Sequence, residues 1–199
     1  MKVMSAPTSP YARKVRMVII EKGLQDRVEV IAASPYDNPP DLLAANPLCK
    51  VPALLTDDGK AIFDSPVICH YLDSLAPPAC LLPEGEARWD YLVREALCDG
   101  ILDAAYNTTM EGRRPEGYRS PDAPKRWRTA IVRAVAAVED DIAGYEGALT
   151  LAQIGLGAAL GYLDFRLADI GWRESCPKTA AWYETFSQRP SMQATRPDA

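Results

Sequence analysis

The pattern of apolar residues changes character at Pro77-Pro78. In the first 75 residues, short strand-like runs alternate with stretches of helical periodicity, in the order βαβ followed by ββα. Beyond Pro83-Glu84-Gly85, strand signals nearly vanish and long helical stretches remain. The sequence therefore predicts an α/β domain over residues 1–76, a linker over 77–86 and an all-helical domain over 87–199.

The individual elements follow from hydrophobic period and from turn residues. Asp57-Asp58-Gly59 predicts a tight hairpin turn, and Gly23 is expected to end the first helix. The expected strands are 3–4, 28–31, 53–55 and 61–63; the expected helices are 10–22, 65–75, 86–111, 123–145, 151–167 and 178–187.

Composition and charge narrow the classes of partner. The 199 residues are 48% hydrophobic and 25% charged, which is typical of a globular protein. A net charge of -5 argues against nucleic acid or an anionic membrane as the main partner. Two local basic runs, 13–16 and 125–128, are interpreted as solvated helix faces.

Cysteine usage and the apolar segments indicate a cytoplasmic protein. The five cysteines are odd in number and lack a CxxC pair, and His70 is the only histidine, so we expect neither a disulfide framework nor a metal site. The N-terminus has no signal-peptide apolar core, and the longest apolar region, 148–163, is too short to span a bilayer. No membrane partner is expected.

Two proline-containing segments indicate a ligand site. Pro52 opens an apolar run and cannot donate to a sheet ladder, so it should occupy a strand's first residue or an edge, with the Val51 backbone left free to hold a peptide. Ser65-Pro66 is typical of an N-cap followed by proline at the first helical position, whose unpaired donors favour a carboxylate. Together they predict a site for a small, anionic, peptide-like ligand.

Three motifs in order carry a family resemblance. Thr8-Ser9-Pro10-Tyr11 stands at the first helix start, Lys50-Val51-Pro52 at the third strand and Asp64-Ser65 at the third helix, followed by an all-helical half. This arrangement resembles soluble, cytosolic-type glutathione S-transferases, and most of all bacterial members with a serine at the first helix. The resemblance implies a thioredoxin-like domain joined to a helical bundle, usually as a homodimer.

The resemblance also implies an activity. It is the transfer of alkyl or aryl groups in detoxification: glutathione serves as co-substrate without a metal, and its thiolate attacks a hydrophobic electrophilic small molecule. The electrophile would lie between the two domains. Candidates for its wall are Tyr106, Asn107, Met110 and Arg113, against the alternative that they form ordinary helix surface or a dimer contact.

Ser9 is the residue that matches the family's sulfur-activating position. Its simplest role is a structural N-cap, worth about 0.5–2 kcal/mol. A hydroxyl can, however, accept from the helix backbone while donating its proton to a sulfur. Lowering a thiol pKa by about two units takes roughly 2.7 kcal/mol, within reach of one such bond plus the helix dipole. Thr8 and Ser5 are alternative hydroxyls in the same loop.

The remaining glutathione contacts are carried over residue by residue. By resemblance, a cis bond before Pro52 turns the Val51 main chain towards the cysteinyl part of glutathione. Ser65 would bind the γ-glutamyl carboxylate, and Asp64 would face the ammonium of that moiety. Lys50 would pair with the glycyl carboxylate. Plain helix capping remains the alternative for Asp64 and Ser65, and an ordinary exposed lysine for Lys50.

Other functions and signals stay open at this point. Serine instead of cysteine at position 9 favours conjugation over glutathione-dependent peroxide or disulfide reduction, but peroxide reduction through the bound thiolate stays open. A non-catalytic glutathione-binding protein is a further alternative. Cys49 is expected to be inert, with glutathionylation as a hypothesis. Thr150 with Gln153 predicts a capping box, where the family usually has aspartate at the second position.

Overall fold

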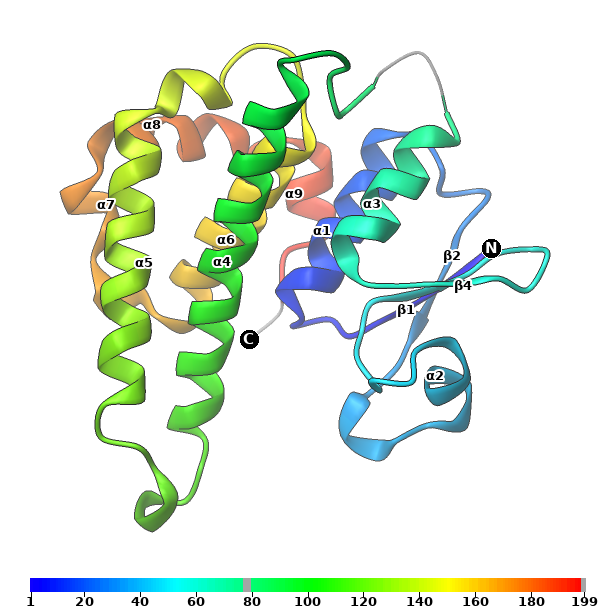
Figure 1. The fold of residues 1–199 in the computed structure, drawn as a ribbon, viewed down its shortest axis with the longest axis horizontal. Coiled ribbons are helices and arrows are strands. Elements are labelled where there is room, and N and C mark those ends of the chain that lie inside the picture. The colour runs from blue at the N-terminus through cyan, green and yellow to red at the C-terminus, as the bar shows by residue number, and fades with distance from the viewer. Residues whose placement is uncertain (77–79, 198–199) are drawn as a thin grey trace. The chain divides into compact units, whose positions relative to one another are not determined.

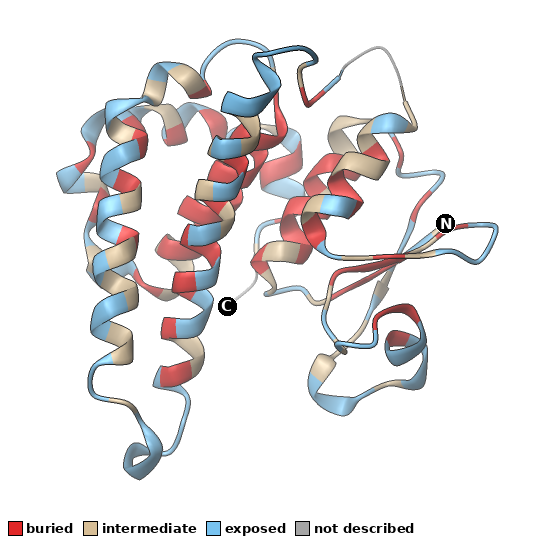
Figure 2. Cartoon of the chain, in the orientation of Figure 1, coloured by how far each residue is buried: buried red, intermediate tan, exposed pale blue. Residues whose placement is uncertain are grey.

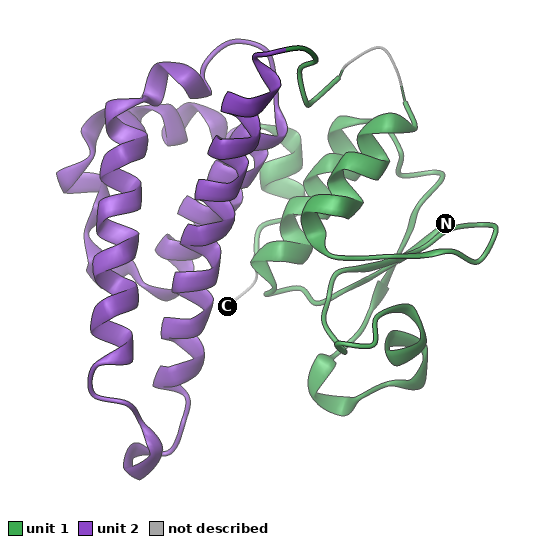
Figure 3. Ribbon diagram, viewed as in Figure 1, with its two compact units in different colours: residues 1–85, 189–199 green, residues 86–188 purple. Residues whose placement is uncertain are grey.

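The computed structural model describes residues 1–76 and 80–197 of the chain. Figure 3 shows two compact units: residues 1–85 with 189–199, and residues 86–188. The C-terminal residues therefore group with the first unit. Pro77 and Pro78, which open the predicted linker, lie outside the described residues. The domain limits given by the sequence stay a prediction.

Unit 1 is built on a small mixed sheet (Figure 1). Its described residues form four strands in the order β2-β1-β3-β4. β1 runs parallel to β2, whereas β3 is antiparallel to both β1 and β4. The βαβ-ββα order predicted from the sequence is confirmed. The elements are β1 (Lys2–Ser5), α1 (Pro10–Glu21), β2 (Glu29–Ala32), a 3-10 turn (Pro35–Asp37), α2 (Pro40–Ala45), β3 (Ala53–Leu55), β4 (Ala61–Ile62), α3 (Ser65–Ser74) and α9 (Pro190–Ala194).

Helices cover both faces of this sheet. Figure 1 shows α1 and α3 on one face and α2 on the other. On the α2 side, Leu42 and Ala45 form an apolar cluster with Met4 and Ala53 of the strands. On the other face, Val15 and Val18 of α1 are fully buried, as the apolar stripe of this helix predicts. The sheet is thus held from two sides.

The basic run in α1 is buried, contrary to the prediction of a solvated face. Arg13 is 5% exposed and Lys14 is fully buried. Arg13 donates from Nη2 to the Met192 carbonyl at 3.1 Å and from Nε to Thr195 Oγ1 at 3.3 Å. The interpretation was wrong because these acceptors lie at the far end of the chain. The second run, 125–128, is exposed or half-buried, as expected.

Unit 2 is helical (Figure 1). Its helix α6 is buried along nearly its whole length (Figure 2), and α4 packs against both α5 and α6. The glycines Gly155, Gly157 and Gly161 lie inside α6 among buried residues, where close packing explains them. The elements are α4 (Arg88–Gly112), a 3-10 turn (Glu116–Tyr118), α5 (Ala123–Asp140), a 3-10 turn (Ile142–Tyr145), α6 (Leu151–Arg166), a 3-10 turn (Ala168–Ile170), α7 (Trp172–Ser175) and α8 (Pro177–Phe186).

The predicted capping box opens α6. The Gln153 side chain accepts from the Thr150 N–H at 2.9 Å, and the Thr150 hydroxyl accepts from the Gln153 N–H at 3.4 Å. Gln153 also donates to the Tyr145 carbonyl at 2.8 Å. An aspartate or glutamate has no donor for that carbonyl, so glutamine here serves the cap and the preceding turn together.

The described residues contain no membrane-spanning helix, no metal-binding cluster and no disulfide. None of their helices combines the length and apolar character needed to cross a membrane. Within residues 1–76 and 80–197, no three His, Cys, Asp or Glu side chains gather as a metal site. The five cysteines, all in the described chain, are free thiols.

Candidate functional site

Strand pairing brings the predicted site segments to one edge of the sheet. Met4 of β1 lies opposite Ala53 of β3, and Leu54 lies opposite Ile62 of β4. The carboxyl ends of β1 and β4 therefore flank the amino end of β3. The loops holding the sequence-predicted residues leave or enter the sheet at these three ends (Figure 1).

Ser9 caps α1 through its side chain. Its backbone is extended, with φ -75 and ψ 121, and its hydroxyl accepts from the Ala12 N–H at 3.2 Å. The Ser9 residue is half-buried, and its hydroxyl proton has no acceptor among the described residues. The cap thus uses the oxygen as an acceptor and leaves the proton available.

The two alternative hydroxyls are placed differently. Ser5 is a buried residue of β1, 4% exposed and paired with Ala32. Thr8 is exposed in the turn before the helix. Of the three hydroxyls in this loop, only that of Ser9 accepts from the helix N-terminus.

Arg16 holds the loop that precedes Ser9. Its Nη2 donates to the Pro7 carbonyl at 3.0 Å. Desolvation by burial, followed by the nearby positive charge of Arg13, lowers the pKa of Arg16 from its usual value. Sequence reasoning missed this role, because the basic run pointed to solvent.

The Val51–Pro52 peptide bond is cis, as the resemblance implies. Pro52 is buried and lies directly before β3, while Val51 is half-buried. Neither the N–H nor the C=O of Val51 has a hydrogen-bond partner in the described part of the chain. This main chain is therefore free to pair with an extended peptide.

Asn46 organises the loop in front of Pro52. It is 2% exposed, donates to the Lys50 carbonyl at 3.0 Å and accepts from the Leu48 N–H at 3.0 Å. The loop shape thus depends on a residue without a predicted role. The Asn46-Pro47 pair, a common turn opener, was its only signal in the sequence.

Asp64, rather than Ser65, occupies the N-cap position of α3. Asp64 has extended backbone, with φ -91 and ψ -159, and α3 begins at Ser65, so the expected N-cap at Ser65 is corrected by one residue. The helix carries Pro66 at its second position, because proline fits the first turn. The Phe63–Asp64 peptide bond is also cis.

The Asp64 and Ser65 side chains are not used for capping. Asp64 is exposed, makes no side-chain cap bond and has no ion-pair partner among the described residues. Ser65 is 2% exposed, and its hydroxyl bonds to no described residue. Both groups, like the Ser9 proton, therefore retain hydrogen-bonding capacity.

Lys50 and Cys49 flank the Val51 main chain. Lys50 is exposed and forms no ion pair with any described residue. Cys49 has a left-handed backbone with φ 50, a conformation that favours glycine. Its thiol donates to the Pro35 carbonyl at 3.5 Å, and its side chain packs on the apolar cluster beside α2.

The electrostatics of this edge favour an anion. α1 and α3 both begin here, so the positive ends of two helix dipoles meet the same loops. Neither helix has an acidic residue in its first turn. With the free Val51 main chain between them, the site suits an extended ligand that carries a carboxylate or a thiolate.

Comparison with known proteins decides the family. The glutathione S-transferase N-terminal domain matches residues 8–75, and the corresponding C-terminal domain matches residues 103–185. The uncharacterised GST-like protein YibF of Escherichia coli K12 is 35% identical over 99% of this chain and 98% of its own length. The chain belongs to the glutathione S-transferase family.

Solved glutathione S-transferases share the fold closely. A family member from Pseudomonas fluorescens Pf-5 with bound glutathione has 41% identity and a TM-score of 0.96, covering 100% of this chain and 99% of the other. A second structure of a family member from that organism, with bound S-(propanoic acid)-glutathione, has 40% identity and a TM-score of 0.92, with 100% of both chains covered.

The candidate wall residues of this glutathione S-transferase family member lie on one helix or directly after it. Tyr106, Asn107 and Met110 belong to α4, and Arg113 follows its last residue. Asn107 and Arg113 are exposed, Tyr106 is 36% exposed and Met110 is half-buried. All four belong to unit 2, whereas the predicted glutathione residues belong to unit 1.

Proposed function

We propose that this protein is a glutathione S-transferase that joins the sulfur of glutathione to an electrophilic small molecule. The observation that carries the proposal is the Ser9 hydroxyl, which accepts from Ala12 at the start of α1 and keeps its proton available. In this proposal, the Ser9 hydroxyl donates a hydrogen bond to the glutathione sulfur, keeps its own proton, and so favours the thiolate over the thiol.

The other contacts follow the sheet edge. The Val51 main chain before Pro52 pairs with the cysteinyl part of glutathione, because its polar groups are free. Ser65 and the α3 N-terminus receive the γ-glutamyl carboxylate. Asp64 faces the ammonium group, and Lys50 pairs with the glycyl carboxylate.

The reaction needs only the thiolate and a suitable carbon. A free thiol with a pKa of about 8.5 is only a few per cent ionised at neutral pH. Once the thiol proton has passed to solvent, the sulfur lone pair forms a carbon–sulfur bond, and the leaving group departs with its electron pair. The bound S-(propanoic acid)-glutathione of the related structure, with its carbon substituent on sulfur, supports conjugation as the reaction type.

We further propose a homodimer in the cytoplasm, acting in detoxification without a metal. The odd number of free cysteines suits a reducing compartment. Light scattering on the purified chain tests the dimer; a monomer mass at micromolar concentration would remove it.

The decisive experiment compares wild type with Ser9→Ala and Ser9→Thr. We expect wild type to be retained on immobilised glutathione and to conjugate chloro-dinitrobenzene. Ser9→Ala should raise the pKa of the bound thiol, read from thiolate absorbance against pH, by about one to two units and lower turnover at neutral pH about tenfold or more. Ser9→Thr, which keeps a hydroxyl, should recover part of both.

The control is Thr8→Ala, an exposed neighbour in the same loop. It should leave the thiol pKa unchanged. Unchanged turnover in Ser9→Ala would remove Ser9 from the mechanism. Tight glutathione binding without reaction across electrophiles, peroxides and disulfides would instead favour a non-catalytic binding protein, and activity on peroxides or disulfides alone would favour a glutathione-dependent reductase.

A further inference from the structure

Unit 2 contains a pocket whose charge is opposite to that of the whole chain. It has a volume of about 500 Å³ and lies among the end of α4, the start of α5 and the residues after α6. Its lining carries Arg113, Arg119, Arg128 and Arg166 but only one carboxylate, that of Glu111. Four arginines in the lining of one pocket, in a protein of net charge -5, mark a local preference for anions.

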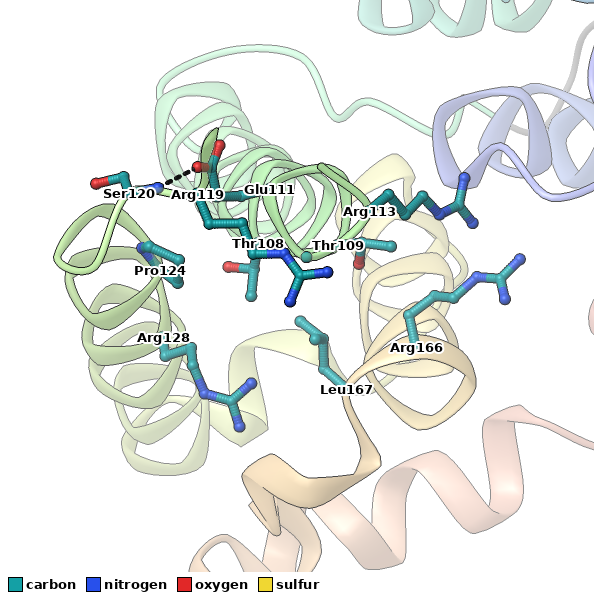
Figure 4. Close-up of a pocket in the computed structure, with 11 residues that line it drawn as sticks. Thr108, Thr109, Glu111, Arg113, Arg119, Ser120, Pro124, Arg128, Arg166 and Leu167 are labelled. Atoms are coloured by element: carbon teal, nitrogen blue, oxygen red, sulfur yellow. Dashed lines mark hydrogen bonds between the residues drawn. The ribbon is translucent and has the colours of Figure 1, made fainter. Parts of the chain in front are cut away.

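Two of these arginines face the interior of the pocket. Figure 4 shows the guanidinium groups of Arg119 and Arg128 directed into the space between the helices, where Thr108 and Leu167 also point. Arg113 and Arg166 extend away from this space in the same view. The pocket therefore has a charged side formed by Arg119 and Arg128 and an apolar side at Leu167.

Arg119 is positioned but not neutralised. Its Nε donates to the Arg114 carbonyl at 2.7 Å, and in the described part of the chain no carboxylate pairs with it. Its terminal nitrogens are thus available to a ligand.

A hydrogen bond to Glu111 fixes the loop that carries Arg119. The Glu111 carboxylate is 9% exposed and accepts from the Ser120 N–H at 2.6 Å. It also lies 3.5 Å from Arg114. The only carboxylate among the lining residues is therefore bound to Ser120 and Arg114. The arginines determine the charge of the pocket.

Arg128 is held by an ion pair with Asp169. The Asp169 side chain is 70% exposed, so water weakens this pair. A ligand oxygen can approach the same guanidinium, because its planar fork accommodates more than one acceptor.

We propose that this pocket binds a compact organic dianion, a dicarboxylate or a phosphate monoester, anchored by Arg119 and Arg128. Both ligand types present paired oxygens that match a guanidinium group. The volume admits a small metabolite, with its carbon chain against Leu167. None of its lining residues is among those proposed to hold glutathione, all of which belong to unit 1.

The test is isothermal titration calorimetry of the full chain with succinate and with glycerol 3-phosphate, at constant ionic strength and with chloride as the blank. We expect saturable binding of at least one anion, and which one binds tells dicarboxylate from phosphate recognition. Arg119→Gln should weaken that binding about tenfold, the value of one charge-assisted bond. Arg128→Gln should weaken it comparably.

The matched control is Arg126→Gln, which removes the same charge from an exposed position on α5 outside the pocket. It should change the affinity by no more than about twofold. Glutathione retention should persist in Arg119→Gln, so failure of this site is distinguishable from failure of the proposed transferase. The proposal is overturned if neither anion binds saturably, or if Arg126→Gln weakens binding as much as Arg119→Gln does.

Discussion

The carboxylate of Glu21 accepts hydrogen bonds from Arg189 at 2.9 Å and 2.8 Å, although 168 positions separate the two residues. The Ser191 hydroxyl donates to the same carboxylate. Glu21 is the last residue of α1, and Arg189 is the N-cap of α9. This bidentate pair therefore fastens the C-terminal segment to the helix that Ser9 caps.

Glu21→Gln is expected to lower the free energy of unfolding by about 1–2 kcal/mol, because the carboxylate accepts from Arg189 and Ser191, whereas glutamine has no negative charge and only one acceptor oxygen. Urea denaturation measures the change. The control is Glu29→Gln, which alters an exposed carboxylate at the start of β2 and should have little effect. Equal losses in the two variants would contradict the assignment.

The Glu21 contribution should also depend on pH. The hydrogen bond from Arg189 lowers the pKa of Glu21, although desolvation by burial opposes this shift. A lowered folded-state pKa means that the stabilisation is complete above the unfolded value of about 4.3 and is lost as pH falls through the folded value. The stability difference between wild type and Glu21→Gln should therefore shrink as pH falls below about 5, where the unfolded chain begins to take up the proton. A constant difference would refute this linkage.

Asp73→Asn should be strongly destabilising, because Asp73 belongs to a buried ion pair in unit 1. Lys22 Nζ lies 2.8 Å from Asp73, and their side chains are 2% and 8% exposed. Asparagine removes the negative charge of a buried ion pair and weakens the bonds that this side chain accepts from Lys22 and from the Leu81 N–H, at a cost of about 3 kcal/mol. Thermal unfolding measures the loss, with Asp26→Asn at an exposed position as the control. A loss no larger than that of the control would show that the Lys22–Asp73 pair contributes little to stability.

Gln153→Glu tests why glutamine closes the capping box of α6. Glutamate still accepts from Thr150 but has no donor for the Tyr145 carbonyl, and its charge would be buried. We expect a loss of about 1–3 kcal/mol at neutral pH and a smaller loss at acidic pH, where a protonated carboxyl can donate. Denaturation at two pH values measures both, and Gln188→Glu, at an exposed position, serves as the control. A pH-independent loss would point to packing instead of the missing donor.

Ser9→Ala should reduce stability as well as activity, and the two effects can be separated. Loss of the Ala12 contact removes a helix cap worth about 1 kcal/mol. Ser9→Thr restores most of the cap, so its unfolding free energy should lie near that of wild type. If Ser9→Ala unfolds like wild type, the 3.2 Å contact contributes nothing to the helix.

The longer helices and the strands were predictable from the sequence, whereas the short helices were not. The ranges 10–22, 65–75 and 151–167 agree with α1, α3 and α6 to within a residue at each end. The helices α2, α7 and α9 have six, four and five residues, so none contains two full turns of periodicity.

The candidate site was predictable in part. Local chemistry indicated the Ser9 cap, and family resemblance indicated the cis bond before Pro52; both are present. The loop support from Arg16 and Asn46 was not indicated, because each acts through a backbone carbonyl that sequence spacing does not identify. The cap of α3 moved to Asp64, since backbone torsion and not residue type defines that position.

The order of the strands and of the longer helices, and the loops that carry the candidate glutathione residues, were determined by the sequence alone, because hydrophobic period and turn residues act over a few positions. Which charged side chains are buried, and which gather in one place, was decided by tertiary structure. The Arg13 acceptors come from a C-terminal segment. The arginine pocket of unit 2 is lined by the C-terminal ends of α4 and α6 together with the start of α5 and the loop before it. Burial and charge clustering depend on groups distant along the chain, which no local pattern encodes.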